Sequence, residues 1–418
     1  MITINSFLFA YIFIYLASTI LDITIDLVNT AHLKRNKGAI PEGFEGMVDQ
    51  KKLSEMERYT RDNTGFGTLK TVVARVVFLF IILSGLLPLF LGIIEGWHYI
   101  LAGLLFFAFP GIIGFIFELP FDYYHTFYLE ERFGFNTNTL RTWIIDHIKS
   151  ILVGVILFSI LLSFLLFMIR HAGNIWWLLA WIFFISFQLL MVVLYPTLIA
   201  PLFNKFEPVK DKELEKAIRE LAEKEGLRIK EIFQMDAGKR SRHTNAYFTG
   251  LGKTKRIVLY DTLIASHNRD EILAVLAHEI GHLKLGHIKK MILMITIASF
   301  ILFFLTSRVL EWGLLYESFG FQSMPQYVGL LLIGFMLEPI GFFLSPISMA
   351  RSRKHEREAD DYAYGLIKDI GPFINALKRM AADNLSNLRP HPLYVRFHYS
   401  HPPIIERIKR LEHLSAKK

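Results

Sequence analysis

Residues 275–287 of this 418-residue chain read VLAHEIGHLKLGH and directly precede a long apolar segment. The spacing of the apolar residues is typical of one helix. On a helix, His278 and His282 lie one above the other on the same face, so both imidazoles can bind a single zinc ion. Glu279 would then lie near an open coordination position, where it can accept a proton from metal-bound water. The stretch predicts a hydrolytic metal site; two solvent-facing histidines on an ordinary helix are the alternative.

The composition of the whole chain indicates a membrane protein. Hydrophobic residues make up 53% of it and charged residues only 20%, which is too apolar for an ordinary soluble domain. The formal net charge of +8 could suggest nucleic acid, but Lys and Arg gather between apolar runs, as in cytoplasmic loops. We therefore expect no nucleic-acid partner. The chain has no cysteine, which excludes disulfides, thiolate ligands and cysteine nucleophiles.

Seven segments are long and apolar enough to cross a hydrocarbon core about 30 Å thick. They lie at approximately residues 5–28, 70–94, 99–118, 150–169, 174–199, 289–312 and 327–350. The loops between them are alternately rich and poor in Lys and Arg, and basic loops stay in the cytoplasm. The alternation predicts an external N-terminus and places residues 200–288 and 351–418 together on the cytoplasmic side. An even number of spans would separate those two segments.

A catalytic zinc site needs a third protein ligand. One known arrangement has a histidine six residues after the second ligand, but position 288 is isoleucine. His287 lies five residues after His282, about 140° around a continuous helix. We therefore expect His287 not to bind the metal.

The remaining candidates follow the last span, in the stretch RSRKHEREADDYAYG. Glu356 and Asp360 are one helical turn apart, so one can ligate zinc while the other accepts the N–H of a ligating histidine. A solvated charged helix is the alternative. Glu358 is two residues from Glu356, about 200° around the axis, so it should point away and be dispensable for metal binding.

Five stretches together resemble the Ste24 family of CAAX prenyl proteases, integral-membrane zinc metalloendopeptidases of clan M48. They are AHEIGHLKLGH, RKHEREADDYAYG, KRSRHTNAYFTG, LIAPLFNKF and HYSHPPIIERI, in the family's relative order. The resemblance covers nearly the whole chain. It implies that Zn²⁺ is held by His278, His282 and Glu356, that Glu279 is the general base, and that Asp360 supports a ligating histidine.

The resemblance also assigns residues around the metal. It implies that His401 and Arg407 face the active site as catalytic groups, and donor groups of this kind can stabilise the oxyanion that forms there. It further implies that Asn245 and Ala246 bind the extended substrate backbone. Without the resemblance, these residues would be assigned to turns and to the protein surface.

The family's fold is mainly α-helical: about seven transmembrane helices enclose a water-filled chamber, and a zinc metalloprotease domain with a small β-sheet lies on the cytoplasmic side. Glu338, near the middle of the last span, is a candidate to line the chamber, because charge at mid-bilayer usually faces an interior or water. Asp22 and Asp26 either do the same or reach the interface.

These features divide the chain into four parts. We expect a five-span N-terminal region (1–199), a cytoplasmic metalloprotease segment (200–288), two more spans (289–350) and a C-terminal segment with the third ligand (351–418). Within the first cytoplasmic segment, residues 211–227 have the pattern of an amphipathic helix. Strand-like runs occupy residues 229–235, 245–250 and 255–265.

The activity implied by the resemblance is removal of the C-terminal aaX tripeptide from prenylated CAAX proteins. The resemblance also allows a second cleavage further upstream in the substrate. Its partners would be the prenylated peptide and membrane lipids, in the endoplasmic reticulum of a eukaryote or the inner or plasma membrane of a prokaryote. A protease of the same chemistry that degrades misfolded, unprenylated membrane proteins is the alternative. A non-hydrolytic zinc module is a third possibility, but a structural site would not need Glu279.

Overall fold

The computed structural model describes residues 2–249 and 254–416 of the chain. Seven helices in these residues are long and apolar enough to cross a membrane, which confirms the predicted number of spans. They are α1 (Ser6–Arg35), α2 (Gln50–Leu83), α4 with the π-helical turn η1 (Tyr99–Glu130), α5 (Leu140–His171), α6 with its extension through α7 (Gly173–Phe203), α11 (His287–Val309) and α13 (Gln326–Ile367).

The limits predicted for the second span are wrong. The apolar pattern continues from residue 70 to residue 94, but α2 ends at Leu83 and a separate helix, α3 (Leu86–Ile94), follows. Gly85 between them has φ +80°, a left-handed conformation that glycine adopts without steric cost. The chain therefore turns at Gly85, and the apolar residues beyond it belong to a different element.

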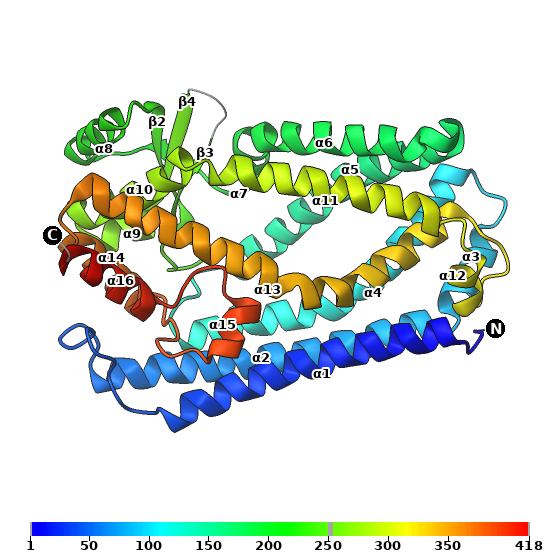
Figure 1. Ribbon diagram of the computed structural model, residues 1–418, viewed down its shortest axis with the longest axis horizontal. Helices are drawn as coiled ribbons and strands as arrows, with labels where there is room; N and C mark the ends of the chain where they lie inside the picture. Colours follow the sequence, from blue (N-terminus) through cyan, green and yellow to red (C-terminus); the bar gives the residue numbers. More distant parts are fainter. Residues whose placement is uncertain (1, 250–253, 417–418) are drawn as a thin grey trace.

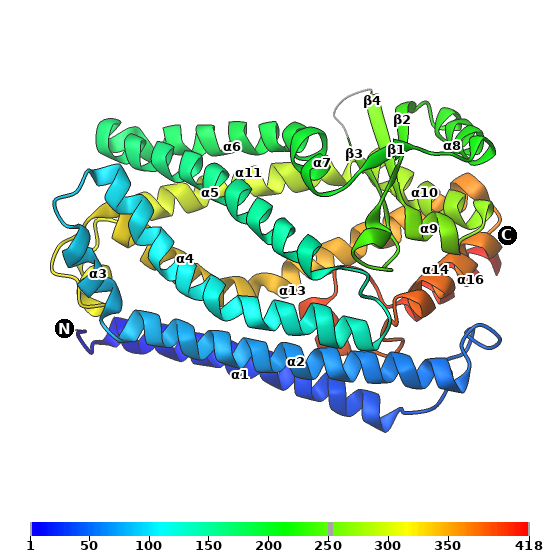
Figure 2. The same ribbon diagram turned by 180° about the vertical axis from the view of Figure 1, so that it is seen from behind.

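The molecule is elongated, with its two termini at opposite ends (Figure 1). α1 and α2 run side by side along one long face, α6 and α11 along the other, and α4 and α13 lie between them (Figures 1 and 2). α3 and α12 (Gly313–Ser318) lie at the N-terminal end, and the sheet lies at the other end with α14 (Gly371–Asp383) and α16 (Ile404–Ala416). Termini at opposite ends agree with an odd number of crossings.

The membrane helices are sparsely packed. In their most apolar windows, the buried share ranges from 0% in α11 to 33% in α13, whereas a close-packed bundle would bury one face of every helix. Many of the uncovered side chains are large and apolar, as is typical of helices that cross a membrane. The implied chamber stays a prediction.

The acidic residues in the spans are compensated by partners on other elements. Glu338 of α13 forms an ion pair with Arg75 of α2. Asp26 of α1 accepts a hydrogen bond of 2.7 Å from Thr68 of α2, and a carboxylate oxygen of Asp22 lies 3.5 Å from His398 Nε2. Such partners lower the cost of burying charge in a membrane and fix these helices relative to one another.

The polar end contains a four-stranded sheet in the order β1-β2-β4-β3. Its strands are β1 (Phe206–Pro208), β2 (Arg228–Met235), β3 (Ala246–Thr249) and β4 (Thr254–Tyr260). β2 and β4 are parallel, and the edge strands β1 and β3 pair antiparallel with their neighbours. The predicted amphipathic helix is α8 (Lys212–Lys224), which packs against β2.

The predicted strand 255–265 is wrong beyond Tyr260. There the chain enters α9 (Asp261–Ser266), because Asp261 at the first turn favours a helix start. Residue 250, the end of the predicted strand 245–250, lies outside the described residues. The boundary expected at residue 350 falls inside α13, which continues from the membrane to Ile367 as one helix. The last span thus carries the third predicted ligand directly.

Candidate active site

α10 (Arg269–Lys284) carries the first two predicted ligands and is held firmly in the core. Its start has a capping box: Asn268 Oδ1 accepts the Glu271 N–H at 2.9 Å, and Glu271 Oε2 accepts the Asn268 N–H at 3.0 Å. This arrangement satisfies donors that the first turn of a helix leaves unpaired. His278 is buried and His282 is partly buried on the same face, as the four-residue spacing predicts.

The prediction that residues 275–287 form one helix is wrong at its end. α10 stops at Lys284, and Gly286, with φ +67°, is the N-cap of α11, which begins at His287. The angular argument that separates His287 from His282 on a continuous helix therefore does not apply. The turn brings the two Nδ1 atoms to 2.9 Å from each other, although His287 lies outside the group of metal-donor atoms around His282.

That donor group consists of His278, His282 and Glu356. His278 Nε2 lies 3.3 Å from Glu356 Oε2, His282 Nε2 lies 3.3 Å from Glu356 Oε1, and the two Nε2 atoms are 3.1 Å apart. Ligands held 2.0–2.1 Å from a tetrahedral ion are separated by about 3.3 Å. Within the described residues, buried Glu356 Oε2 has no hydrogen-bond partner. The donor types and their separations fit a divalent metal ion.

A glycine allows α10 and α13 to approach closely enough to form this group. A Cβ atom on Gly281 would lie 3.0 Å from the carbonyl oxygen of Ala359 and 3.1 Å from its Cα, which is closer than ordinary packing permits. The glycine within HEIGH thus lets the backbone of α13 lie against α10. This contact places Glu356 opposite the two histidines.

Asp360 and Arg407 form a buried layer behind His278. Asp360, fully buried, lies 2.7 Å from His278 Nδ1, and Arg407 Nε and Nη2 donate to its two oxygens at 2.9 and 2.7 Å. Burial raises the pKa of Asp360, but the charge of Arg407 and these hydrogen bonds outweigh it and hold the pKa at about 2. Ionised Asp360 keeps a proton on His278 Nδ1 and leaves Nε2 free for a metal.

Arg407 lies in the site, and its Nε and Nη2 atoms donate to Asp360. The catalytic role that the resemblance implies for Arg407 stays a prediction. His401 Nε2 lies 3.4 Å from Oε1 of Glu356, one of the metal-donor residues. Its side chain is 61% exposed, so it forms part of the rim that a substrate could reach.

Glu279 has the electrostatic environment of a proton acceptor. Burial raises its pKa, while the nearby His278 and His282 oppose that shift. A raised pKa makes a carboxylate a stronger proton acceptor, which is what a general base requires. Glu279 is the next residue after His278 on α10, and its carboxylate interacts electrostatically with His278, His282 and Glu356.

β3 offers a backbone edge near these groups. Among the described strands it pairs only with β4, and it contacts α10. Ala246 begins the strand with its side chain buried, and Asn245 Oδ1 accepts the Ala246 N–H at 2.8 Å. An extended peptide can add to the outer edge of such a strand by main-chain hydrogen bonds.

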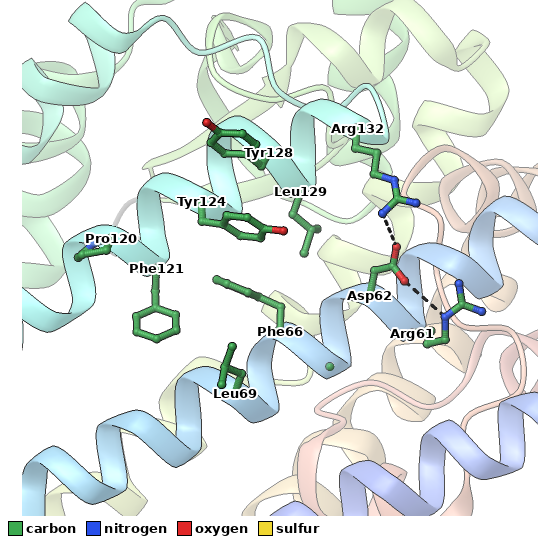
Figure 3. A pocket seen from close by; sticks show the side chains of 11 residues that line it. Arg61, Asp62, Phe66, Leu69, Pro120, Phe121, Tyr124, Tyr128, Leu129 and Arg132 are labelled. Atoms are coloured by element: carbon green, nitrogen blue, oxygen red, sulfur yellow. Dashed lines mark hydrogen bonds and ion pairs between the residues drawn. The ribbon is translucent and has the colours of Figure 1, made fainter.

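A cavity of about 650 Å³ lies elsewhere, between α2 and the end of α4 (Figure 3). Phe66 and Phe121 line it, and Arg61 and Arg132 flank it, both paired with Asp62. None of the residues lining this cavity is a metal donor. We therefore do not assign it to the active site.

Comparison with known proteins covers most of the chain. The family described as "CAAX prenyl protease N-terminal, five membrane helices" matches residues 29–205, and "Peptidase family M48" matches residues 208–415. The chain is 36% identical to the CAAX prenyl protease 1 homolog of Arabidopsis thaliana, covering 89% of this chain and 90% of that protein. It is 39% identical to CAAX prenyl protease 1 of Saccharomyces cerevisiae, covering 72% and 70%.

A solved structure gives the same result for the fold. The crystal structure of S. mikatae Ste24p superimposes with a TM-score of 0.92 at 30% identity, covering 98% of this chain and 100% of that one. Together with the seven apolar helices and the donor group between α10 and α13, these matches settle the family. The chain is an integral membrane protein that belongs to the M48 family of metallopeptidases, in the group that contains the CAAX prenyl proteases.

Proposed function

We propose that this protein is a zinc-dependent membrane endopeptidase that removes the C-terminal aaX tripeptide from prenylated CAAX proteins. The observation that carries the proposal is the donor group of His278, His282 and Glu356, whose 3.1–3.3 Å separations suit tetrahedral zinc. Adjacent Glu279 supplies the base that a purely structural metal site would not need. The similarity to CAAX prenyl proteases over nearly all of their length supports the substrate class.

The roles follow from the position of each side chain. His278, His282 and Glu356 would hold the zinc ion, which when bound would supply a Lewis acid and lower the pKa of the attacking water. Glu279 accepts the proton of the attacking water and delivers it to the leaving amide nitrogen. His401, on the rim, donates a hydrogen bond to the oxygen of the carbonyl under attack.

Arg407 and Asp360 act indirectly, through the metal-binding residue His278. Arg407 neutralises Asp360, and Asp360 orients His278 through its Nδ1–H. We assign the outer edge of β3 to the substrate, whose extended backbone would pair with Ala246 while the Asn245 side chain turns from the Ala246 N–H to the peptide. The catalytic part is thus assembled from residues 200–288 and 351–418, on either side of two spans.

The proposed cleavage is tested with purified, zinc-loaded protein and two matched peptides, a farnesylated CAAX peptide and the same peptide without the lipid. We expect release of the tripeptide, detected by mass spectrometry, with a preference of about tenfold or more for the farnesylated peptide, since about 1.4 kcal/mol of apolar contact is enough for that factor. A chelator should abolish cleavage and added zinc should restore it.

The alternatives give different results in the same experiment. Equal cleavage of both peptides would favour degradation of unprenylated or misfolded membrane proteins. Cleavage that survives complete removal of metal would exclude the zinc mechanism. A zinc-loaded protein that cleaves neither peptide would indicate a binding module.

We further propose that the catalytic end faces the cytoplasm and that the N-terminus is outside. The alternation of basic and non-basic loops supports this orientation through the positive-inside rule. In a eukaryotic cell the membrane would be that of the endoplasmic reticulum, and in a prokaryote the inner or plasma membrane.

The orientation is tested by labelling single cysteines in this cysteine-free chain with a membrane-impermeant maleimide. Trp97→Cys and Ser323→Cys, both in exposed loops at the N-terminal end, should label without permeabilisation of cells or vesicles that keep the native orientation. Lys51→Cys and Glu412→Cys, both exposed at the opposite end, should label only after permeabilisation. Labelling of Glu412→Cys from outside would reverse the proposed orientation.

A further inference from the structure

A second group of donor-type side chains lies beside the first: His287, His355 and Glu358. A second metal site is one interpretation. However, the rings of His287 and His355 are stacked, with centroids 4.1 Å apart and planes within 7° of parallel. The lone pair of a ring nitrogen lies in the plane of its ring, so a bound ion lies in that plane too. Two stacked, parallel rings cannot share one ion in this arrangement.

The hydrogen bonds of His287 point instead to its neighbour in the metal site. His287 Nε2 lies 3.0 Å from Glu358 Oε2, and His287 Nδ1 lies 2.9 Å from His282 Nδ1. Glu358 thus turns away from the metal-donor atoms, as its helical position predicts, but it contacts the metal site through one intervening imidazole. The expectation that Glu358 is dispensable for metal binding is based on helical position alone and does not consider this contact through His287.

The direction of these two hydrogen bonds follows from the chemistry of the groups. An ionised carboxylate can only accept, so His287 Nε2 donates to Glu358, and Nδ1 of a neutral His287 ring then accepts. His282 must therefore donate its Nδ1–H to His287, which leaves the lone pair on His282 Nε2. That atom faces Glu356 at 3.3 Å.

Any other arrangement would block metal binding at His282. If His287 Nδ1 donated to His282, the proton of a neutral His282 would move to Nε2, the atom in the donor group. A doubly protonated His287 would also donate from Nδ1, and the proton of a neutral His282 would again lie on Nε2. Only the order Glu358, His287, His282, with each imidazole donating toward the carboxylate, leaves His282 able to bind the metal.

We propose that Glu358 and His287 form a positioning relay that fixes the tautomer and ring orientation of His282. Asp360 does the same for His278 directly, at 2.7 Å, so each metal-binding histidine is supported by a carboxylate. Gly286, with φ +67°, makes the relay possible because it ends α10 and returns His287 toward His282. The inference rests on the metal ligands assigned under the proposed function.

The test measures the zinc affinity of the purified full-length protein by competition with a chelator of known affinity, without any peptide. Loss of an outer hydrogen-bond partner of a metal-binding histidine typically weakens metal binding 10–100-fold. We expect His287→Phe, which keeps the ring stacked on His355 but removes both nitrogens, and Glu358→Ala to bind zinc about tenfold more weakly. Glu358→Gln keeps an acceptor oxygen and should remain within about threefold of the wild type.

His355→Phe is the matched control, because it alters the stacked partner of His287 and leaves the relay in place. Its zinc affinity should equal that of the wild type. In the cobalt-substituted protein, His287→Phe should change the visible absorption spectrum, which reports ligand geometry at the metal, while His355→Phe should not. A variant that is only misfolded would lose thermal stability. It would not explain why Glu358→Gln keeps its zinc affinity or why His287→Phe alone changes the cobalt spectrum.

Three outcomes would overturn the relay. Unchanged zinc affinity in both His287→Phe and Glu358→Ala would show that His282 needs no support. Binding of two zinc ions per chain, with the second lost in His355→Phe, would favour a second metal site. A wild-type chain that binds no zinc would remove the relay together with the assigned ligands. Zinc binding with the expected variant pattern but no cleavage would leave the relay standing and contradict only the proposed peptidase activity.

Discussion

Replacing Glu279 with glutamine is expected to leave zinc bound and to lower peptide hydrolysis by about 10²–10⁴-fold, the usual contribution of a general base. Glu279 is not one of the three metal donors, so the metal site stays intact. Glutamine has the size of glutamate but cannot accept the proton of the attacking water. Burial raises the pKa of Glu279, which makes this carboxylate a stronger proton acceptor than an exposed one.

The measurement compares kcat for the farnesylated peptide with the zinc content of the same sample. Glu223→Gln, an exposed glutamate on α8, is a control for the loss of one negative charge and should match the wild type in both. A Glu279→Gln protein that keeps full zinc and full activity would show that another group accepts the proton. Loss of zinc in that variant would show that Glu279 contributes to metal binding.

Replacing Glu356 with alanine is expected to remove both zinc and activity, a larger defect than that of the Glu279 variant. Only His278 and His282 would remain, with their Nε2 atoms 3.1 Å apart and no negative charge between them. Two imidazoles hold zinc poorly compared with three ligands. The substitution also opens a space in the contact between α10 and α13, where Glu356 is buried.

Metal analysis and thermal unfolding together distinguish this result from simple misfolding. Zinc binds only the folded wild-type site and should raise its midpoint of unfolding, since a ligand that binds the native state stabilises it. Glu356→Ala should show no such rise at any zinc concentration while it still unfolds cooperatively. Glu358→Ala keeps all three donors and should still respond to zinc, at a concentration about tenfold higher. A Glu356→Ala protein that binds zinc as the wild type does would show that the third ligand is a different residue.

Hydropathy and helical spacing by themselves determine much of this protein. The seven spans follow from runs of apolar residues, and the shared face of His278 and His282 follows from their four-residue spacing. Both properties are local, because the geometry of a helix relates residues within a few turns. The same reasoning sets Glu356 and Glu358 on different faces of one helix.

The limits of the elements are less accessible from sequence. Gly85 and Gly286 both adopt left-handed conformations that end one helix and begin another. Glycine permits such a turn but does not require it, and the apolar pattern continues across both positions. The pattern therefore extends the second span too far and predicts a single helix over residues 275–287.

Only the tertiary structure decides which side chains meet. His278 and Glu356 are far apart in the sequence, and they face each other because Gly281 lets α13 pack against α10. The packing of α16 against α13 brings Arg407 to Asp360, and the packing of α13 beside the start of α11 brings Glu358 to His287. Such contacts depend on how separate helices pack, and the spacing of residues within each helix carries no information about its partner.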